Sequence, residues 1–183
     1  MGDMVGSRQK FLILLLLFTM TISLTSCGNS GPRTTTIEEQ LKYHKEDSAE
    51  GRSARILKCL SEDDKETLKD MFSPKAKRRK RLDKEIDKAM RFFDGKAVDG
   101  WKVQGGSGGA AYDYGKITYK EANPYIYPLK TNTGKVYAIY GYSYIVNKKE
   151  PDRVGLNAIT IIEAPDDNYT DYSNAPEVTI GTP

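Results

Sequence analysis

The sequence is poor in the side chains on which most catalytic and metal sites depend. It contains one histidine, His44, and two cysteines, Cys27 and Cys59. His44 lies in a highly charged N-terminal stretch, so no Ser-His-Asp or Cys-His pair is expected within the folded domain. No cluster of histidine and cysteine supports a zinc site either. We therefore expect a non-enzymatic protein with no catalytic residues, no metal and no cofactor.

An excess of one charge sign is also missing. The 183 residues include 28 Lys and Arg against 25 Asp and Glu, which gives a net charge of +3. A dedicated nucleic-acid binder usually shows a strongly basic domain, with a pI above about 9. Nucleic acid is therefore not an expected partner. At roughly 100–200 residues per domain, the length predicts one domain with appendages.

No apolar run in the sequence is long enough to span a membrane, which takes about 20 residues. The run FLILLLLFTMTISL covers residues 11–24 and is diluted by threonine and serine. It follows Arg8 and Lys10, and a positive segment before a short apolar one is typical of a secretory signal peptide.

The residues that end this run resemble a bacterial lipobox. Leu24-Thr25-Ser26-Cys27 places leucine three positions before the cysteine, with small residues between them. The resemblance implies that the Cys27 thiol receives a diacylglycerol, with acyl chains such as palmitate, and that cleavage occurs after Ser26. Two acyl chains give a stable anchor, whereas one gives marginal binding. A chance cysteine after an ordinary signal peptide or a short anchor helix is the alternative.

The sequence therefore divides into four segments. They are a signal peptide (1–26), a lipidated cysteine with a flexible linker (27–46), an α+β domain (47–163) and a polar C-terminal tail (164–183). The Gly, Ser, Thr and Pro residues of the linker extend over at most about 30 Å between positions 28 and 36. We expect a protein anchored by Cys27 to the extracytoplasmic face of the cell membrane. The tail is interpreted as disordered or as a peripheral strand.

Helical periodicity is confined to the first half of the domain. Apolar spacing predicts helices over about 47–60 and 63–72, and a third that follows Ser73-Pro74 and ends near residue 93. The charged stretch from Thr36 to Asp47 is interpreted as a frayed helix or an extension of the linker. Residues 96–163 instead form β-branched and aromatic runs separated by turn residues. The pattern predicts an α+β fold of about three N-terminal helices packed on a curved antiparallel sheet of four to five strands.

Several segments taken together resemble a bacterial lipoprotein family catalogued as domain of unknown function 5104. They are SARILKCLSEDDKETLKDMFS, LDKEIDKAMRFFDGK, GGSGG, NPYIYPLKTNTGKVYAIYGYSYIVNKKEPDRVGL and ITII, within residues 47–163. The resemblance implies a cystatin-like, nuclear-transport-factor-2-like cone, in which helices cover a curved sheet with a pocket between them. The family has no assigned activity, so the resemblance implies no functional residues. This fold hosts enzymes and binders alike.

Tyrosine is abundant in the strand region, where nine of the 12 lie between positions 112 and 144. Tyr140, Tyr142 and Tyr144 alternate along the predicted central strand and therefore share one face. Such residues either pack as ordinary strand tyrosines or present their hydroxyls to a ligand in a pocket. We select Trp101 and this trio as candidate ligand-binding residues.

The run KAKRRKR, at positions 75–81, concentrates positive charge at a predicted helix start. Its cations are Lys75, Lys77, Arg78, Arg79, Lys80 and Arg81. One interpretation is a solvated helix start. Cations at a helix N-terminus oppose the helix dipole, however, which favours contact with an anionic lipid or wall polymer. We carry both interpretations.

The function expected from these patterns is a membrane-anchored lipoprotein that binds a small ligand or an envelope protein. A structural or accessory surface domain with a closed pocket is the first alternative. A proton-transfer enzyme built from tyrosine and a carboxylate is the second. The carboxylates near the strands, each interpreted as a turn or surface acid, are Asp94, Asp99, Asp113 and Glu121. Cys59 is interpreted as a small buried hydrophobic residue.

Overall fold

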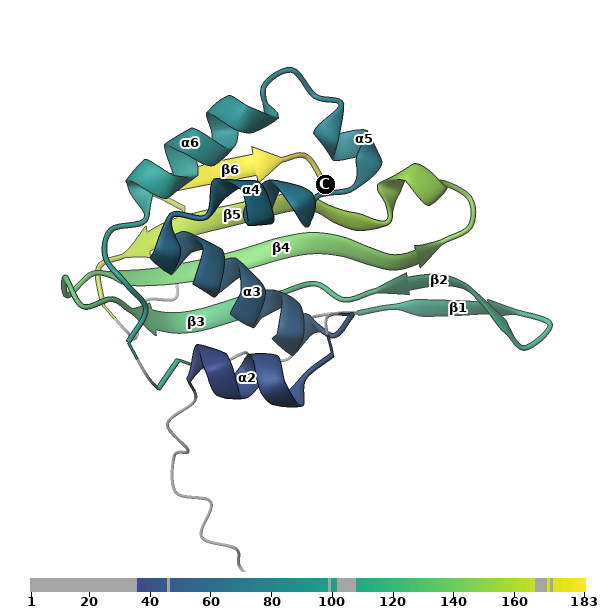
Figure 1. Cartoon of the computed structure of the whole chain (residues 1–183), viewed down its shortest axis with the longest axis horizontal. Coiled ribbons are helices and arrows are strands. Elements are labelled where there is room, and N and C mark those ends of the chain that lie inside the picture. The colour runs from purple at the N-terminus through teal and green to yellow at the C-terminus, as the bar shows by residue number, and fades with distance from the viewer. Residues whose placement is uncertain (1–35, 46, 99, 102–107, 167–170, 172) are drawn as a thin grey trace, which may run out of the picture. The chain divides into compact units, whose positions relative to one another are not determined.

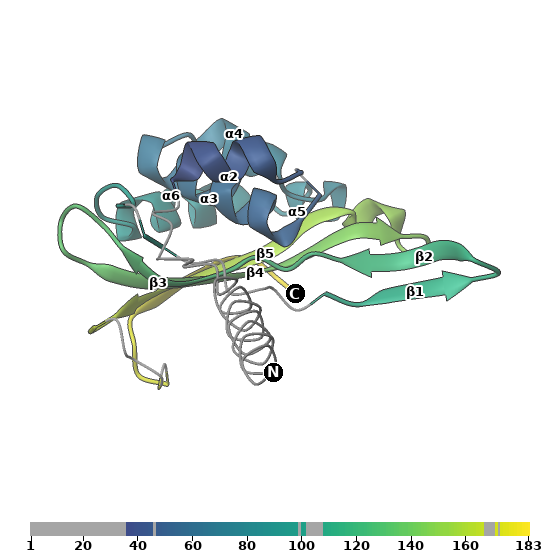
Figure 2. The ribbon, with the colours of Figure 1, turned by 90° about the horizontal axis from the view of Figure 1, so that it is seen from below.

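The computed structural model describes residues 36–45, 47–98, 100–101, 108–166, 171 and 173–183. The predicted signal peptide, Cys27, most of the linker and Asp99 lie outside these residues. The described chain is an α+β fold, which confirms the predicted class, and its helices cover one face of an antiparallel sheet (Figures 1 and 2). Within it, no helix has the length and apolar character needed to cross a membrane.

The described chain contains more helices than the three expected. They are α2 Ile37–Tyr43, α3 Ala49–Glu62, α4 Lys65–Asp70, α5 Pro74–Lys77 and α6 Leu82–Phe92, followed later by the 3₁₀ turn η1 Pro151–Arg153. The charged stretch that was interpreted as a frayed helix or linker forms α2, which begins with a capping box between Thr36 and Glu39. The predicted third helix is broken, because four consecutive cations occupy residues 78–81. Like charges three or four positions apart destabilise a helix.

The sheet has six strands instead of four or five. They are β1 Ala110–Asp113, β2 Lys116–Glu121, β3 Tyr125–Lys130, β4 Val136–Asn147, β5 Gly155–Ala164 and β6 Glu177–Gly181. Their order is β1-β2-β4-β5-β6, and β3 also pairs with β4. β4 is therefore central, with β5 along one side and β3 and β2 sharing the other. The extra strand, β6, lies in the predicted tail and pairs with β5.

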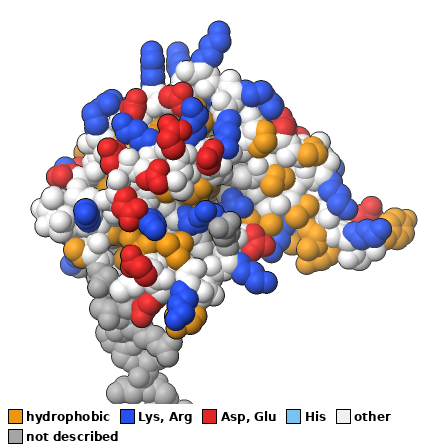
Figure 3. Space-filling view, viewed as in Figure 1, with side chains coloured by type: hydrophobic (Ala, Val, Ile, Leu, Met, Phe, Trp, Pro, Cys, Tyr) orange, Lys and Arg blue, Asp and Glu red, His pale blue; other side chains and the backbone are white. Residues whose placement is uncertain are grey.

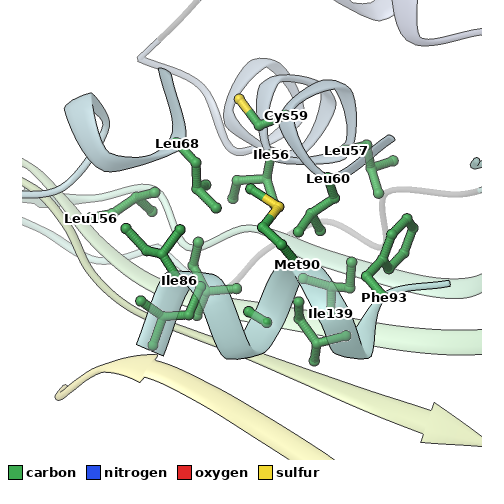
Figure 4. Close-up of a cluster of buried hydrophobic side chains, with 14 of the residues drawn as sticks. Ile56, Leu57, Cys59, Leu60, Leu68, Ile86, Met90, Phe93, Ile139 and Leu156 are labelled. Carbon is green, nitrogen blue, oxygen red and sulfur yellow. The ribbon is translucent and has the colours of Figure 1, made fainter. Parts of the chain in front are cut away.

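Apolar side chains fill the space between the helices and the sheet (Figure 4). The cluster includes Ile56, Leu57 and Leu60 of α3, Leu68 of α4, Ile86 and Met90 of α6, Phe93, and Ile139 and Leu156 of the sheet. Fully burying one such side chain contributes about 1.5–3 kcal/mol. This helix–sheet interface is therefore a packed core, and a site has to be sought at other surfaces.

Candidate functional site

The four residues selected as candidate ligand contacts lie in different environments. Tyr137 reaches the helical layer, where its hydroxyl donates to the Phe92 carbonyl at 3.1 Å. Successive strand residues point to opposite faces, so Tyr140 and Tyr142 project from the sheet face away from the helices. Tyr140 is 44% exposed, and Tyr144 is buried. Trp101 packs in the hydrophobic core instead. Only Tyr142 and Tyr144 are brought into direct contact.

A carboxylate on β2 links Tyr142 to a further tyrosine, Tyr119. Glu121 Oε1 accepts hydrogen bonds from the hydroxyls of Tyr119 and Tyr142, the latter at 3.1 Å. Its Oε2 accepts from the Asn123 amide at 3.1 Å. The Tyr144 hydroxyl donates to the Tyr142 hydroxyl, also at 3.1 Å. We name these five residues the tyrosine–glutamate cluster.

The rings of the cluster are also packed against one another. Tyr144 stands edge-on to Tyr142 and to Tyr119, with centroid distances of 5.4 and 5.3 Å. The Arg153 guanidinium lies 5.3 Å from the centroid of the Tyr144 ring. Edge-on pairs and cation–π contacts each contribute about 0.5–1.5 kcal/mol. The ring orientations are therefore fixed from several sides.

A chain of hydrogen bonds connects the cluster to α3. Asn123, buried below Glu121, accepts from the Ser143 backbone N–H at 2.9 Å through its Oδ1. The Ser143 hydroxyl in turn accepts from Arg52 Nη1 at 2.5 Å. These hydrogen bonds run from α3 through Ser143 to Asn123 and on to Glu121. The first turns of α3 thus help to hold the cluster in place.

The hydrogen-bonding groups of the cluster are occupied by one another. Glu121 accepts three hydrogen bonds from side chains, which involve both of its oxygens. The hydrogen bond with Tyr144, burial and the Glu121 charge together raise the pKa of Tyr142 above its ordinary value. Tyr142 therefore keeps its proton at neutral pH. The cluster is therefore held together by hydrogen bonds among its own side chains.

The sequence pattern selected Tyr142 and Tyr144 but not the residues that join them. Tyr119 and Glu121 lie two positions apart on β2, and this spacing places both on one sheet face. That signal was available in the sequence, although Glu121 was interpreted as a turn or surface acid. Their approach to Tyr144 depends on a register shift between Lys120 and Glu121. No local sequence feature specifies that shift.

A pocket of about 410 Å³ opens between α2, α3 and α4, and we name it the α2–α3 pocket. Its lining consists of Leu41, His44, Gly51, Arg55, Lys58, Cys59, Glu62, Asp64 and Thr67. Ligand pockets commonly measure about 300–1,000 Å³. His44 was expected to lie away from the folded domain, and this expectation is wrong. Because α2 packs on α3, His44 borders the same pocket as Cys59.

This pairing of His44 with Cys59 does not make a nucleophile. Cys59 is 2% exposed, and burial raises the pKa of its thiol to about 11. Catalytic cysteines have lowered pKa values and sit in electropositive, partly exposed surroundings. The structure therefore agrees with the interpretation of Cys59 as a small buried residue.

Alkylation measures this burial directly. In a chain that begins at residue 34, Cys59 is the sole cysteine. At pH 8 its raised pKa alone lowers the thiolate fraction about a hundredfold, so iodoacetamide should react at least that much more slowly than in urea. Mass spectrometry of timed samples gives the two rates. Comparable rates in the two solvents would show that Cys59 is accessible and reactive.

The basic run is largely engaged in ion pairs with its own domain. The pairs are Lys75–Glu150 at 2.9 Å, Lys77–Asp70 at 3.2 Å, Arg78–Asp152 at 2.6 Å and Arg79–Glu85 at 2.9 Å. Glu85 also accepts from the Gly181 backbone N–H at 2.9 Å, which ties α6 to β6. The described residues include no ion pair of Lys80 or Arg81. Contact with an anionic surface stays a prediction, and Lys80 and Arg81 are the residues of the run that we expect to make it.

Comparison with known proteins adds one match. The sequence model described as Domain of unknown function (DUF5104) matches residues 55–164. The match runs from within α3 to the end of β5, so it includes the tyrosine–glutamate cluster. Among curated proteins, none matches the chain. The family description names no activity.

Proposed function

The chain belongs to the family described as domain of unknown function 5104, and we propose that it is a lipid-anchored binding domain of the extracytoplasmic membrane face. In this proposal it binds a small ligand and catalyses no reaction. The α2–α3 pocket is the observation that supports ligand binding. The short apolar run and Leu24-Thr25-Ser26-Cys27 support the anchor. We also propose the nuclear-transport-factor-2-like arrangement as the finer fold, on the basis of helices covering one sheet face.

The charges around the pocket favour a small polar ligand that carries both signs. Helix α3 places Arg55, Lys58 and Glu62 along one stripe at spacings of three and four residues. The hydroxyl and backbone N–H of Thr67 lower the pKa of Asp64, which stays ionised at neutral pH. The cations therefore lie along α3, and the carboxylates lie toward its C-terminal end. An amino acid or a short peptide has charges that suit this separation.

A stabilisation assay tests the pocket. Residues 34–183 form one compact unit that contains the described hydrophobic core, so they are suited to expression without the N-terminal segment. A ligand at a hundred times its Kd should stabilise this unit by about 2.7 kcal/mol. We expect a panel of amino acids, dipeptides and lipid headgroups to include a compound that raises its Tm. Lys58→Glu should abolish that rise.

Lys42→Glu is the matched control, since Lys42 is an exposed lysine of α2 outside the pocket lining. Equal loss in both variants would mean that overall charge, and not the pocket, controls binding. If no compound stabilises the unit, the binding proposal is wrong. The second candidate, an accessory surface domain, would then be preferred. The closed tyrosine–glutamate cluster is the observation that favours it.

The proposed partners follow from the proposed location of the domain at the extracytoplasmic face of the membrane. The diacylglycerol on Cys27 supplies the membrane contact, and an envelope protein is the other partner that such a domain would meet. Lys80 and Arg81 would face anionic lipid or wall polymer. Nucleic acid is not part of the proposal, because the charge balance of the chain does not favour it.

A further inference from the structure

The β1–β2 hairpin projects from the sheet as a two-stranded ribbon (Figures 1 and 2). Only Tyr119–Glu121 of β2 pair with β4, and β1 pairs with β2 alone among the described strands. All of β1 is exposed, as are the first two residues of β2. An isolated two-stranded hairpin is marginally stable in water. The side chains of this ribbon are available to a partner.

Large apolar groups gather at the end of the ribbon. Tyr112 is 65% exposed, Tyr114 is 99% exposed and Ile117 is 36% exposed. Tyr112 and Ile117 are directly opposite in the ladder, so their side chains share one face. Positive φ values at Tyr114 and Gly115 make the turn tight and place the tyrosine at its extremity. We name Tyr112, Tyr114 and Ile117 the aromatic tip, and Figure 3 shows hydrophobic side chains along this arm.

Both charge signs occur along the ribbon, with a small excess of lysine: Lys116, Lys120 and Lys148 against Asp113 and Glu121. Residues 110–118 contain one carboxylate, Asp113, and one lysine, Lys116. Lys120 follows on β2, and Lys148 lies beside the same strand because its N–H donates to the Thr118 carbonyl at 2.9 Å. Tyrosine rings concentrate at the level of lipid headgroups, and lysine side chains extend to reach the phosphates. This combination complements an anionic bilayer.

We propose that the aromatic tip inserts into the interfacial layer of an anionic membrane. The inference rests on the proposed location of the protein at the membrane, and it adds a second contact beside the lipid on Cys27. The two acyl chains on Cys27 would already give a stable anchor, so the tip would add a contact and is not required for attachment. The second contact would also restrict the orientation of the domain over the bilayer.

Fluorescence of the unit 34–183, which lacks the acyl chains, tests insertion. Tyr114→Trp places a reporter at the tip, while Trp101 is only 3% exposed and should not respond to lipid. With vesicles of phosphatidylglycerol and phosphatidylcholine at low salt, we expect a blue shift and quenching by brominated lipid. Vesicles of phosphatidylcholine alone, or high salt, should weaken both signals.

Flotation with the same vesicles measures how much of the unit 34–183, with Tyr114 in place, partitions onto the membrane. Tyr112→Ser with Tyr114→Ser should lower partitioning about tenfold or more, because the apolar contact is removed. Tyr43→Ser removes a tyrosine of α2 that is 72% exposed, and it should leave partitioning unchanged. Circular dichroism confirms that each variant is folded.

Three results would overturn the proposal. The first is that the emission of the Tyr114→Trp variant does not shift with anionic vesicles. The second is that partitioning depends on Lys80 and Arg81 and not on the tip. The third is that the unit does not bind vesicles but sediments as a dimer that the tip substitutions dissociate, which would assign the tip to a second copy of the chain. Ligand-induced stabilisation at the α2–α3 pocket is measured separately, so failure of either idea leaves the other tested on its own readout.

Discussion

Replacing Tyr137 with alanine is expected to lower the free energy of unfolding by about 3–5 kcal/mol, as truncation of a large buried ring generally does. Tyr137 is 0% exposed on the central strand β4. Its ring centroid lies 4.9 Å from that of Phe93 and 6.1 Å from that of Phe92. The ring therefore fills the space beneath the end of α6, and removing it leaves a cavity at the helix–sheet interface.

The hydroxyl of Tyr137 contributes separately. It accepts from the Asp94 N–H at 2.9 Å and donates to the Phe92 carbonyl at 3.1 Å. These groups belong to the end of α6, where backbone carbonyls lack partners within the helix. Tyr137→Phe should therefore lower the free energy of unfolding by about 1–2 kcal/mol. Burial raises the pKa of Tyr137, so the hydroxyl stays protonated at neutral pH.

Urea unfolding followed by circular dichroism measures these changes in the unit 34–183. Tyr140→Ala is the matched control, because Tyr140 lies on the same strand but is 44% exposed. Its expected cost is at most about 1 kcal/mol. Equal losses for Tyr137→Ala and Tyr140→Ala would show that burial does not distinguish the two tyrosines.

These two tyrosines also show where a strand pattern loses information. Residues 136–146 are fairly apolar on both faces, since β4 is central and covered for much of its length. Alternation therefore separates Tyr137 from Tyr140, but it does not say which of them faces the helices. That is decided by the packing of α6, a contact between segments 45 residues apart. Trp101 was grouped with Tyr140, Tyr142 and Tyr144, whereas it packs in the core. Nothing in the local sequence distinguishes a core tryptophan from one that contacts a ligand.

Elements whose sequence carries a local signal were predicted well. Helix α6 follows from the spacing of Leu82, Ile86 and Met90, all of which are buried. The turn between β3 and β4 follows from the glycine at position 134, where φ is +85°. β6 is short and lies in a polar tail, so its Val178 and Ile180 gave too little pattern to choose between a strand and disorder. They are buried because β6 pairs with β5 and packs against α6, contacts that are distant in the sequence.

The tyrosine–glutamate cluster needed information of another kind. Tyr119 and Glu121 share a sheet face by spacing alone, but their distance from Tyr144 depends on two irregularities in strand pairing. One lies between Lys120 and Glu121, and the other lies next to Gly141, between Tyr142 and Ser143. A glycine within a strand, such as Gly141, is typical of a bend. It does not specify an extra residue in the neighbouring strand, because bulges are fixed by the whole sheet.

A Cys27→Ala chain is expected to lose all labelling by a clickable palmitate precursor in a bacterial host, since a thioether to diacylglycerol requires the thiol. The other cysteine offers no substitute. Cys59 is 2% exposed and its pKa is raised to about 11, so neither access nor thiolate is available. In-gel fluorescence after metabolic labelling measures the effect, with an immunoblot to correct for protein amount.

Cys59→Ala is the matched control for this experiment, and it should retain full labelling. Alanine replaces one small buried side chain with another, so the domain should still fold, with a loss of stability near the lower end of the range for core truncation. Labelling that persists in Cys27→Ala would place the acyl chains elsewhere and remove the anchor from the proposed function. The α2–α3 pocket would be unaffected. The aromatic tip and the cations Lys80 and Arg81 would then be the membrane contacts still proposed for this chain.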